Sequence, residues 1–398
     1  MSGHVASDVA GRSDDEDWHD QSDPEWIVPR YGWDRASAAD NAGADHMDQR
    51  TGGLTVQRAQ VVRRLWCVPR RHFPWVALAI AAACRGADDY ALYERMSDRR
   101  APTTDGVSIG IASTDTRFVA TLMGLRNPES VRYDSTQDVY FISNMSGFGS
   151  VKDGDGYIAR VSASDLKTAS VFIKGGVGGV TLDAPKGMAL SGDTLWVTDI
   201  DKLRGFHRTS GAPLATLDFA PLGAVLLNDV AVRPGGEIRV TDTGIRMTED
   251  GNYYVGPSRI FAVGPKAAIR PVDSSAHEPN GIAWDTTRRQ WVVVSFDPFA
   301  WRVWSMGDGD SVRTLLSRER QGKLDGVEVL PSGAILYASW ADSSLHMLEN
   351  GRDRQVLREV PAPADIGIDT RRHRVAVPLP TMGWVQVWTV ADSVGRRR

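Results

Sequence analysis

The stretch EPNGIAWDTTRRQWVVVSF, from Glu278 to Phe296, predicts how this chain folds. Asn280 and Gly281 stand before a short apolar run that ends at Asp285. Four polar residues follow, and then a β-branched and aromatic run from Trp291. Two short apolar runs separated by turn-forming residues are typical of two β-strands joined by a tight turn.

The same pattern occurs six times along the chain. The other copies are RNPESVRYDSTQDVYFISN from Arg126, DAPKGMALSGDTLWVTDI from Asp183, LLNDVAVRPGGEIRVTDT from Leu226, LDGVEVLPSGAILYASW from Leu324 and APADIGIDTRRHRVAVPLP from Ala362. Each copy has one polar residue just before its first strand, and the separations of these residues are 57, 42, 52, 45 and 40. A repeat of this length built from strands predicts an all-β fold, a six-bladed β-propeller with about four strands per blade.

The last copy is one strand short, because the chain ends soon after Val385 to Thr389. Arg117 to Met123 precedes the first copy and has no partner of its own. We expect this N-terminal strand to complete the final blade, which would close the ring and remove exposed sheet edges.

The six polar residues define a predicted ring at one mouth of the central channel, since the first strand of each blade lines that channel. The ring residues are Glu129, Lys186, Asn228, Asn280, Asp325 and Asp365. Asp229 is expected either to contact the substrate or to support the ring from behind. Asp242 ends a second strand, and we expect it to form a turn away from the mouth.

The chemistry of this ring favours a divalent cation. Glu129, Asn228, Asn280 and Asp325 offer four oxygen ligands with a formal charge of −2, and such hard ligands suit Ca²⁺. The ring has neither His nor Cys, which argues against zinc, although Zn²⁺, Mg²⁺ and Mn²⁺ remain alternatives. Lys186 is expected to bind an anionic group of the substrate or product, and Asp365 to contact the substrate.

Composition excludes several other classes of protein. A net charge of −4 gives no electrostatic case for nucleic acid. No glycine-rich strand–turn–helix motif for a dinucleotide is present. The two cysteines, Cys67 and Cys84, both precede the repeats. Disulfides and cysteine-ligated metals are therefore not expected in the propeller.

The front of the chain has a different composition. Residues 1–60 are rich in acidic residues and lack apolar periodicity, so they are predicted to be disordered or an upstream extension that is not translated. Residues 61–84 resemble a signal peptide that ends in a lipobox-like Ile80–Cys84, so we expect export and a lipid anchor on Cys84. Residues 85–110 resemble a tether, 111–392 form the propeller and 393–398 a basic tail.

Four motifs resemble the senescence-marker-protein/gluconolactonase/luciferin-regenerating-enzyme-like (regucalcin-like) propellers. They are PES at Pro128, LNDVAV at Leu227, PNGIAWD at Pro279 and LDGVEV at Leu324. The resemblance implies that Glu129, Asn280 and Asp325 ligate the cation, that Asn228 is a ligand or substrate contact, and that Asp325 is the general base in lactone hydrolysis.

Two functions follow as competing hypotheses. The first is a periplasmic or extracellular metal-dependent hydrolase, a lactonase or esterase acting on a small molecule. The second is a secreted, non-catalytic propeller of the NHL-like kind, whose mouth binds a ligand or a protein partner.

Overall fold

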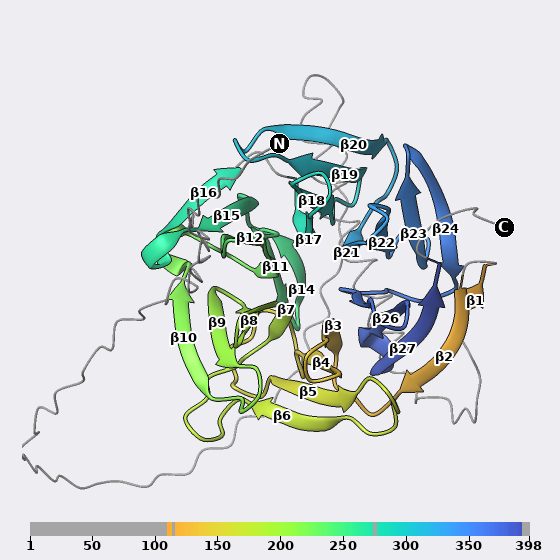
Figure 1. The fold of residues 1–398 in the computed structure, drawn as a ribbon. Helices are drawn as coiled ribbons and strands as arrows, with labels where there is room; N and C mark the ends of the chain where they lie inside the picture. The colour runs from red at the N-terminus through yellow and green to blue at the C-terminus, as the bar shows by residue number, and fades with distance from the viewer. Residues whose placement is uncertain (1–109, 114–115, 274–276, 392–398) are drawn as a thin grey trace, which may run out of the picture. The chain divides into compact units, whose positions relative to one another are not determined.

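A computed structural model describes residues 110–113, 116–273 and 277–391 of the chain (Figure 1). Apart from one separate hairpin, the strands in these ranges form six antiparallel sheets set around a common axis like the blades of a propeller. The six-bladed β-propeller predicted from the six repeats is confirmed.

Each of the first three sheets has one sequence repeat at its inner edge. The first sheet contains β3 (Pro128–Asp134), β4 (Val139–Asn144), β5 (Tyr157–Ser162) and β6 (Ser170–Lys174). The second contains β7 (Pro185–Ser191), β8 (Thr194–Asp199), β9 (Lys202–His207) and β10 (Pro213–Asp218). The third contains β11 (Leu227–Val232), β12 (Ile238–Asp242), β15 (Arg259–Val263) and β16 (Ile269–Asp273).

The remaining three sheets continue around the axis. The fourth contains β17 (Pro279–Asp285), β18 (Gln290–Ser295), β19 (Trp301–Met306) and β20 (Val312–Arg318). The fifth contains β21 (Leu324–Val329), β22 (Ile335–Ser339), β23 (Ser344–Glu349) and β24 (Arg352–Arg358), with β1 (Ile111–Ala112) added at its outer edge. The sixth contains β25 (Gly367–Asp369), β26 (Arg374–Leu379) and β27 (Trp384–Val390), and β2 (Thr116–Leu122) pairs with β27 as its outermost strand.

One hairpin interrupts the regular pattern. β13 (Ile245–Thr248) and β14 (Gly251–Tyr254) form a separate two-stranded sheet between β12 and β15. Three short 3₁₀ helices, η1 (Ala220–Leu222), η2 (Pro265–Ala267) and η3 (Pro380–Met382), lie in connections between the described strands.

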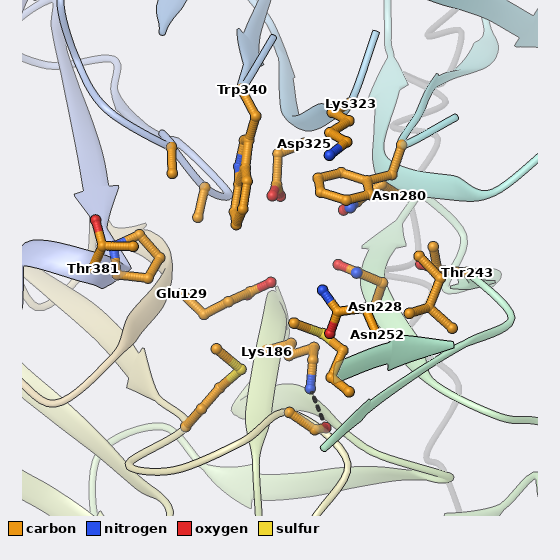
Figure 2. Close-up of a pocket in the computed structure, with 18 of the residues that line it drawn as sticks. Glu129, Lys186, Asn228, Thr243, Asn252, Asn280, Lys323, Asp325, Trp340 and Thr381 are labelled. Carbon is orange, nitrogen blue, oxygen red and sulfur yellow. Dashed lines mark hydrogen bonds between the residues drawn. The ribbon is translucent and has the colours of Figure 1, made fainter. Parts of the chain in front are cut away.

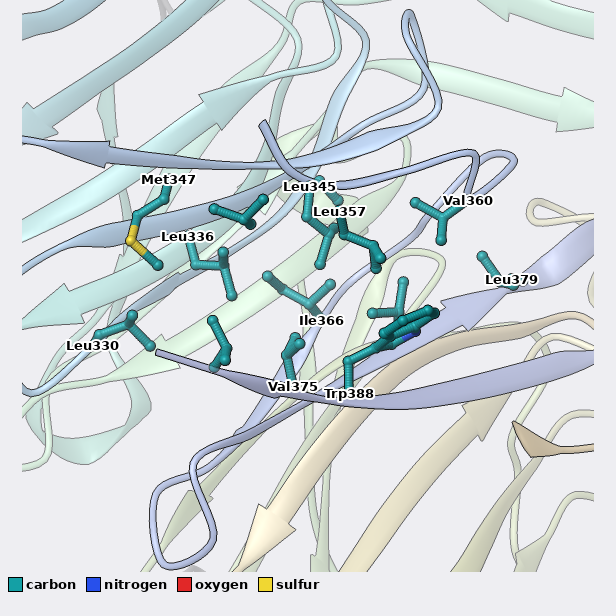
Figure 3. Close-up of a cluster of buried hydrophobic side chains, with 14 of the residues drawn as sticks. Leu330, Leu336, Leu345, Met347, Leu357, Val360, Ile366, Val375, Leu379 and Trp388 are labelled. Carbon is teal, nitrogen blue, oxygen red and sulfur yellow. The ribbon is translucent and has the colours of Figure 1, made fainter. Parts of the chain in front are cut away.

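Burial decreases from the axis outwards. Strand β18 is buried along nearly its whole length, whereas the outer strand β10 is exposed or half-buried throughout. The core is formed between neighbouring sheets, as in the cluster of Leu336, Leu345, Ile366 and Trp388 between the fifth and sixth sheets (Figure 3). Each such side chain contributes about 1.5–3 kcal/mol when fully buried.

Buried aspartates close the first hairpin of three sheets. Asp134 Oδ1 accepts the main-chain N–H of Thr136 at 2.8 Å, and Asp285 Oδ1 accepts that of Arg288 at 2.9 Å. Asp369 Oδ1 accepts the N–H of Arg371 at 2.9 Å. This local bonding stabilises the turn that each repeat carries between its two strands.

Several predictions fall outside the described residues. These are the disordered stretch 1–60, the signal-like segment 61–84 with Cys84, the tether 85–110 except Gly110, and the tail 393–398. The described part of the chain has no helix that is both long and apolar enough to cross a membrane.

Candidate functional site

The ring residues occupy β-bulges in the innermost strands. In five sheets the pairing of the first two strands shifts register where the ring residue and its successor stand, for example between Pro279 and Ile282. The sequence predicted each ring residue just before its strand, but in these five sheets the strand begins one residue before the ring residue. The bulge explains the difference, because it lets a polar side chain leave the alternation of the strand.

Glycines after three ring residues let neighbouring inner strands approach closely. A Cβ at Gly281 would lie 2.4 Å from the carbonyl oxygen of Asp325, and one at Gly326 would lie 2.5 Å from the Cα of Asp365. A Cβ at Gly187 would lie 2.3 Å from Oδ1 of Asp229. These positions therefore need glycine because the next inner strand occupies the space of a side chain.

The second strand of each sheet supports the ring. Thr198 Oγ1 donates to the carbonyl of Asn228 at 2.7 Å, and Thr241 Oγ1 donates to that of Asn280 at 2.6 Å. Asp242 Oδ1 accepts the N–H of Leu226 at 2.9 Å, directly before Asn228. Asp242 also accepts the N–H of Gly244 at 3.2 Å, so it stabilises a turn as expected, at the end of β12 that pairs with Leu227.

Five ring residues line one cavity of about 280 Å³ at the mouth of the channel: Glu129, Lys186, Asn228, Asn280 and Asp325 (Figure 2). They come from the inner strands of five successive sheets. Figure 2 shows Asp325 and Asn280 on one side of the cavity and Lys186 and Asn252 on the other. The convergence predicted from the spacing of the repeats is thus observed for these five residues.

Four of these side chains have an oxygen that is buried and accepts no hydrogen bond. The atoms are Glu129 Oε2, Asn228 Oδ1, Asn280 Oδ1 and Asp325 Oδ1. Buried polar atoms are normally satisfied, so four such oxygens around one cavity form a donor set that fits a cation. No group of three or more His, Cys, Asp or Glu arranged to hold a metal occurs in the described ranges. The four oxygens of this site come from two carboxylates, Glu129 and Asp325, and from two amides, which are not among those residue types.

The electrostatics of the site show an excess of negative charge. Burial, and then the nearby carboxylates of Asp325 and Asp365, raise the pKa of Glu129 well above its usual value. Burial, and then Asp365, likewise raise the pKa of Asp325. A positive charge placed among these oxygens would favour their ionised forms.

Lys186 is buried near Glu129 and lies at the cavity wall. Its ammonium group donates to the carbonyl of Gly149 at 2.8 Å and to that of Ala184 at 3.2 Å. Burial lowers the pKa of Lys186 to about 8, although Glu129 acts in the opposite direction. An ammonium group has three N–H donors, so one of them is not used by these two carbonyls.

Asp365 and Asp229 are not among the residues that line the cavity. The Asp365 carboxylate accepts a hydrogen bond from Ser130 at 2.5 Å and lies 3.9 Å from Arg132. Burial raises the pKa of Asp365 to about 7, against the effect of Arg132. Its predicted contact with substrate stays a prediction.

Asp229 links two blades behind the ring. Its Oδ1 accepts the N–H of Val230 at 2.7 Å, and its Oδ2 accepts the N–H of Ile282 at 2.8 Å. These bonds hold β11 against β17, the strands that carry Asn228 and Asn280. They favour the second of the two expectations for Asp229, support of the ring from behind.

Several cavity residues were not foreseen from the sequence, because they lie in loops between the second and third strands. Trp340 and Phe296 follow β22 and β18 and form an edge-to-face pair with centroids 5.2 Å apart. Met247 and Asn252 come from the β13–β14 hairpin. The long interval of 52 residues between Asn228 and Asn280 was the one signal of this insertion.

The fold and site define a six-bladed propeller with a polar, oxygen-rich cavity at one mouth. A family model described as "SMP-30/Gluconolactonase/LRE-like region" matches residues 128–368, more than half of the chain. The chain belongs to this family. No curated protein matches it in sequence.

Solved structures share the fold at low sequence identity. A gluconolactonase from Xanthomonas campestris is 14% identical, with a TM-score of 0.53 over 72% of this chain and 99% of that one. A luciferin-regenerating enzyme is 14% identical, with a TM-score of 0.52 over 69% of this chain and 96% of that one. A protein of unknown function from Bacteroides thetaiotaomicron is 10% identical, with a TM-score of 0.52 over 70% and 73% of the two chains.

Proposed function

We propose that the protein hydrolyses a lactone or related ester with the help of a divalent cation held by Glu129, Asn228, Asn280 and Asp325. The observation that carries this proposal is the set of four buried, unpartnered oxygens that four different blades direct into one cavity. Leaving one buried polar atom unsatisfied costs about 1–3 kcal/mol, so four together are readily explained by a bound ligand. Membership of a family named after gluconolactonase supports the same reaction class.

The donor set suits a hard cation. All four proposed ligands are carboxylate or amide oxygens, which Ca²⁺ prefers, and they supply two negative charges. Mg²⁺ and Mn²⁺ use similar ligands, whereas Zn²⁺ usually takes at least one imidazole or thiolate. When bound, the cation supplies an electrophile that polarises the substrate carbonyl and stabilises negative charge on its oxygen.

Asp325 is the proposed general base. Its carboxylate lies in the cavity wall and has two oxygens, so one can hold the cation while the other accepts a proton from a water molecule. The water oxygen forms a bond to the carbonyl carbon, and the ring C–O bond then breaks. Asp325 returns the proton to the leaving alkoxide oxygen, and the product is a hydroxy acid.

Lys186 is the proposed anchor for an anionic group. Two of its three N–H donors hold Gly149 and Ala184, which fixes the ammonium group at the wall. The third can donate to the carboxylate that hydrolysis creates or to an anionic substituent of the substrate. Export and a lipid on Cys84 remain part of the proposal for the intact protein.

The experiment measures metal content and turnover on the full chain. Bound metal is determined by mass spectrometry, and aldonolactones and acyl lactones are screened with and without a chelator. Asp325→Asn removes the base without changing the size of the side chain, and Asp165→Asn, at an exposed carboxylate, is the matched control. Absence of both metal and turnover rejects the proposal, and ligand binding without turnover favours the non-catalytic alternative.

A further inference from the structure

We propose that the substrate carries an apolar aliphatic or aromatic group. This group packs in the part of the cavity away from the ring residues, between the Phe296–Trp340 pair and a second wall formed by Phe148 and Met247. The inference rests on the proposed function, because the reacting carbonyl must lie at the polar floor among the ring residues. It adds the chemical class of the rest of the substrate.

The second wall is built by the hairpin that interrupts the third blade. Met247 on β13 is bonded through its main chain to the β4–β5 loop of the first blade. Its carbonyl accepts the N–H of Ser150 at 3.0 Å, and its N–H donates to Ser150 Oγ at 2.9 Å. The hairpin therefore reaches past the second blade and forms part of the cavity wall together with that loop.

This wall is tightly packed against the floor. A Cβ at Gly149 would lie 3.0 Å from the sulfur of Met247 and 3.3 Å from Nζ of Lys186. Gly149 is thus enclosed between the hairpin and the ring. Phe148 precedes it and lines the same cavity.

The aromatic pair lies on the Asp325 side of the cavity. Phe296 and Trp340 contact each other edge to face, with ring planes at 83°, and both line the cavity. Figure 2 shows Trp340 next to Asp325, on the side opposite Lys186 and Asn252. A ligand whose carbonyl is at Asp325 therefore extends away from the ring, between the Phe296–Trp340 pair and the wall formed by Phe148 and Met247.

The polar groups of the walls fit an amphipathic ligand better than a polyhydroxylated one. Above the ring, the buried cavity-lining side-chain atoms without a partner in the described ranges are Trp340 Nε1 and Thr381 Oγ1. Thr243 Oγ1 already donates to the carbonyl of Pro279. Asn252 and Gln321 are exposed and remain hydrated. Lys323 and Ser343 also line the cavity, but an aldonolactone would still place several of its hydroxyls against Phe and Met side chains, and each unmade hydrogen bond lowers affinity.

The first test uses γ-lactams with 5-alkyl chains of increasing length, which are isosteres of γ-lactones that resist hydrolysis. Their dissociation constants for the calcium-supplied full chain are measured by calorimetry. Affinity should rise about threefold to fourfold for each of the first few methylenes. Phe148→Ser and Met247→Thr should flatten this increase. Val255→Thr, directly after the same hairpin and outside the cavity lining, should leave the increase intact.

The second test separates this inference from the proposed function. Rates on 5-alkyl γ-lactones are compared with the rate on glucono-δ-lactone, and long-chain lactones should be the better substrates. Flat lactam affinities with faster turnover of glucono-δ-lactone overturn the inference and leave the hydrolase standing. Chain-length-dependent lactam binding without turnover of any lactone keeps the ligand class and removes the hydrolase.

Discussion

The main-chain N–H of Asp365 donates to the carbonyl of Glu129 at 2.9 Å, and the N–H of Val131 donates back to the carbonyl of Asp365 at 3.2 Å. These bonds join the inner strand of the sixth blade to that of the first. Ring residues that are 236 positions apart (365 − 129) in the chain are therefore held in contact. The geometry of the site depends on close approach between inner strands of neighbouring blades.

Gly326→Ala tests that close approach. The new Cβ would lie 2.4 Å from the main-chain nitrogen of Ile366, so the fifth and sixth blades must move apart. Overpacking of this kind costs about 1–3 kcal/mol, and the backbone contact places this variant at the upper end. The change is measured as the free energy of unfolding in urea. Gly309→Ala is the matched control, because nothing lies within 4 Å of its new Cβ. Equal stability of the two variants would contradict the packing argument.

Glu129→Gln and Asp325→Asn test the proposed ligands. Each change removes one negative charge while it keeps the shape of the side chain. We expect Ca²⁺ affinity to fall at least about tenfold in both, and kcat to fall by about 10²–10⁴ in Asp325→Asn. In chelator, Asp325→Asn should be more stable than the wild type, because it removes a buried carboxylate near Asp365, whereas Glu129→Gln should gain less, because Lys186 loses a nearby negative charge. Calorimetric titration and thermal unfolding check these outcomes, and unchanged calcium affinity would reject the ligand set.

The fold and five cavity residues could be predicted from the sequence because both follow from the regular spacing of the repeats. Asn280 occupies the same place in its repeat as Glu129 and Asp325 in theirs, and a propeller brings equivalent places to one axis. The position of Asp365 behind the cavity could not be predicted in this way. It depends on Ser130 and Arg132, side chains of another blade.

The walls of the cavity could not be predicted because they have no repeat. The contact of Met247 with Ser150 joins loops that are 97 residues apart in the chain. Neither segment has a periodic pattern. The sequence IRMTEDGNYY, residues 245–254, does not indicate which blade the hairpin contacts. Loops of this kind are placed by the surfaces around them, so their contribution to the site appears only in the folded chain.

Lys186→Met separates the lysine from the proposed ligands. The variant removes a buried positive charge near Glu129, so Ca²⁺ should bind at least as tightly as in the wild type. The carbonyls of Gly149 and Ala184 lose their donor, and the substrate loses its anchor. We expect KM to rise about tenfold, which corresponds to one lost hydrogen bond to a charged group. Weaker calcium binding together with an unchanged KM would show that Lys186 is not a substrate contact.

His346 predicts a dependence of stability on pH that is unrelated to the cavity. Its Nδ1 lies 3.1 Å from Asp353 Oδ1 and its Nε2 lies 3.0 Å from Asp342 Oδ2, and its ring stacks on Tyr337. Burial alone would lower the pKa of His346, but the two aspartates outweigh burial and raise it above the usual value. The protonated histidine thus stabilises the fold.

This stabilisation is complete below the unfolded-state pKa of about 6.5 and is lost as pH rises through the higher folded-state value. His346→Gln should therefore cost more stability at pH 5.5 than at pH 8.5. Urea unfolding at the two pH values measures the difference, and His277→Gln, at an exposed histidine, is the control. Arg318 lies 2.7 Å from Asp353 and Arg320 lies 3.8 Å from Asp342, so the aspartates keep cationic partners after the histidine is neutral. The cost should consequently decline with pH without global unfolding, and a cost that is equal at both pH values would show that His346 is neutral in the folded protein.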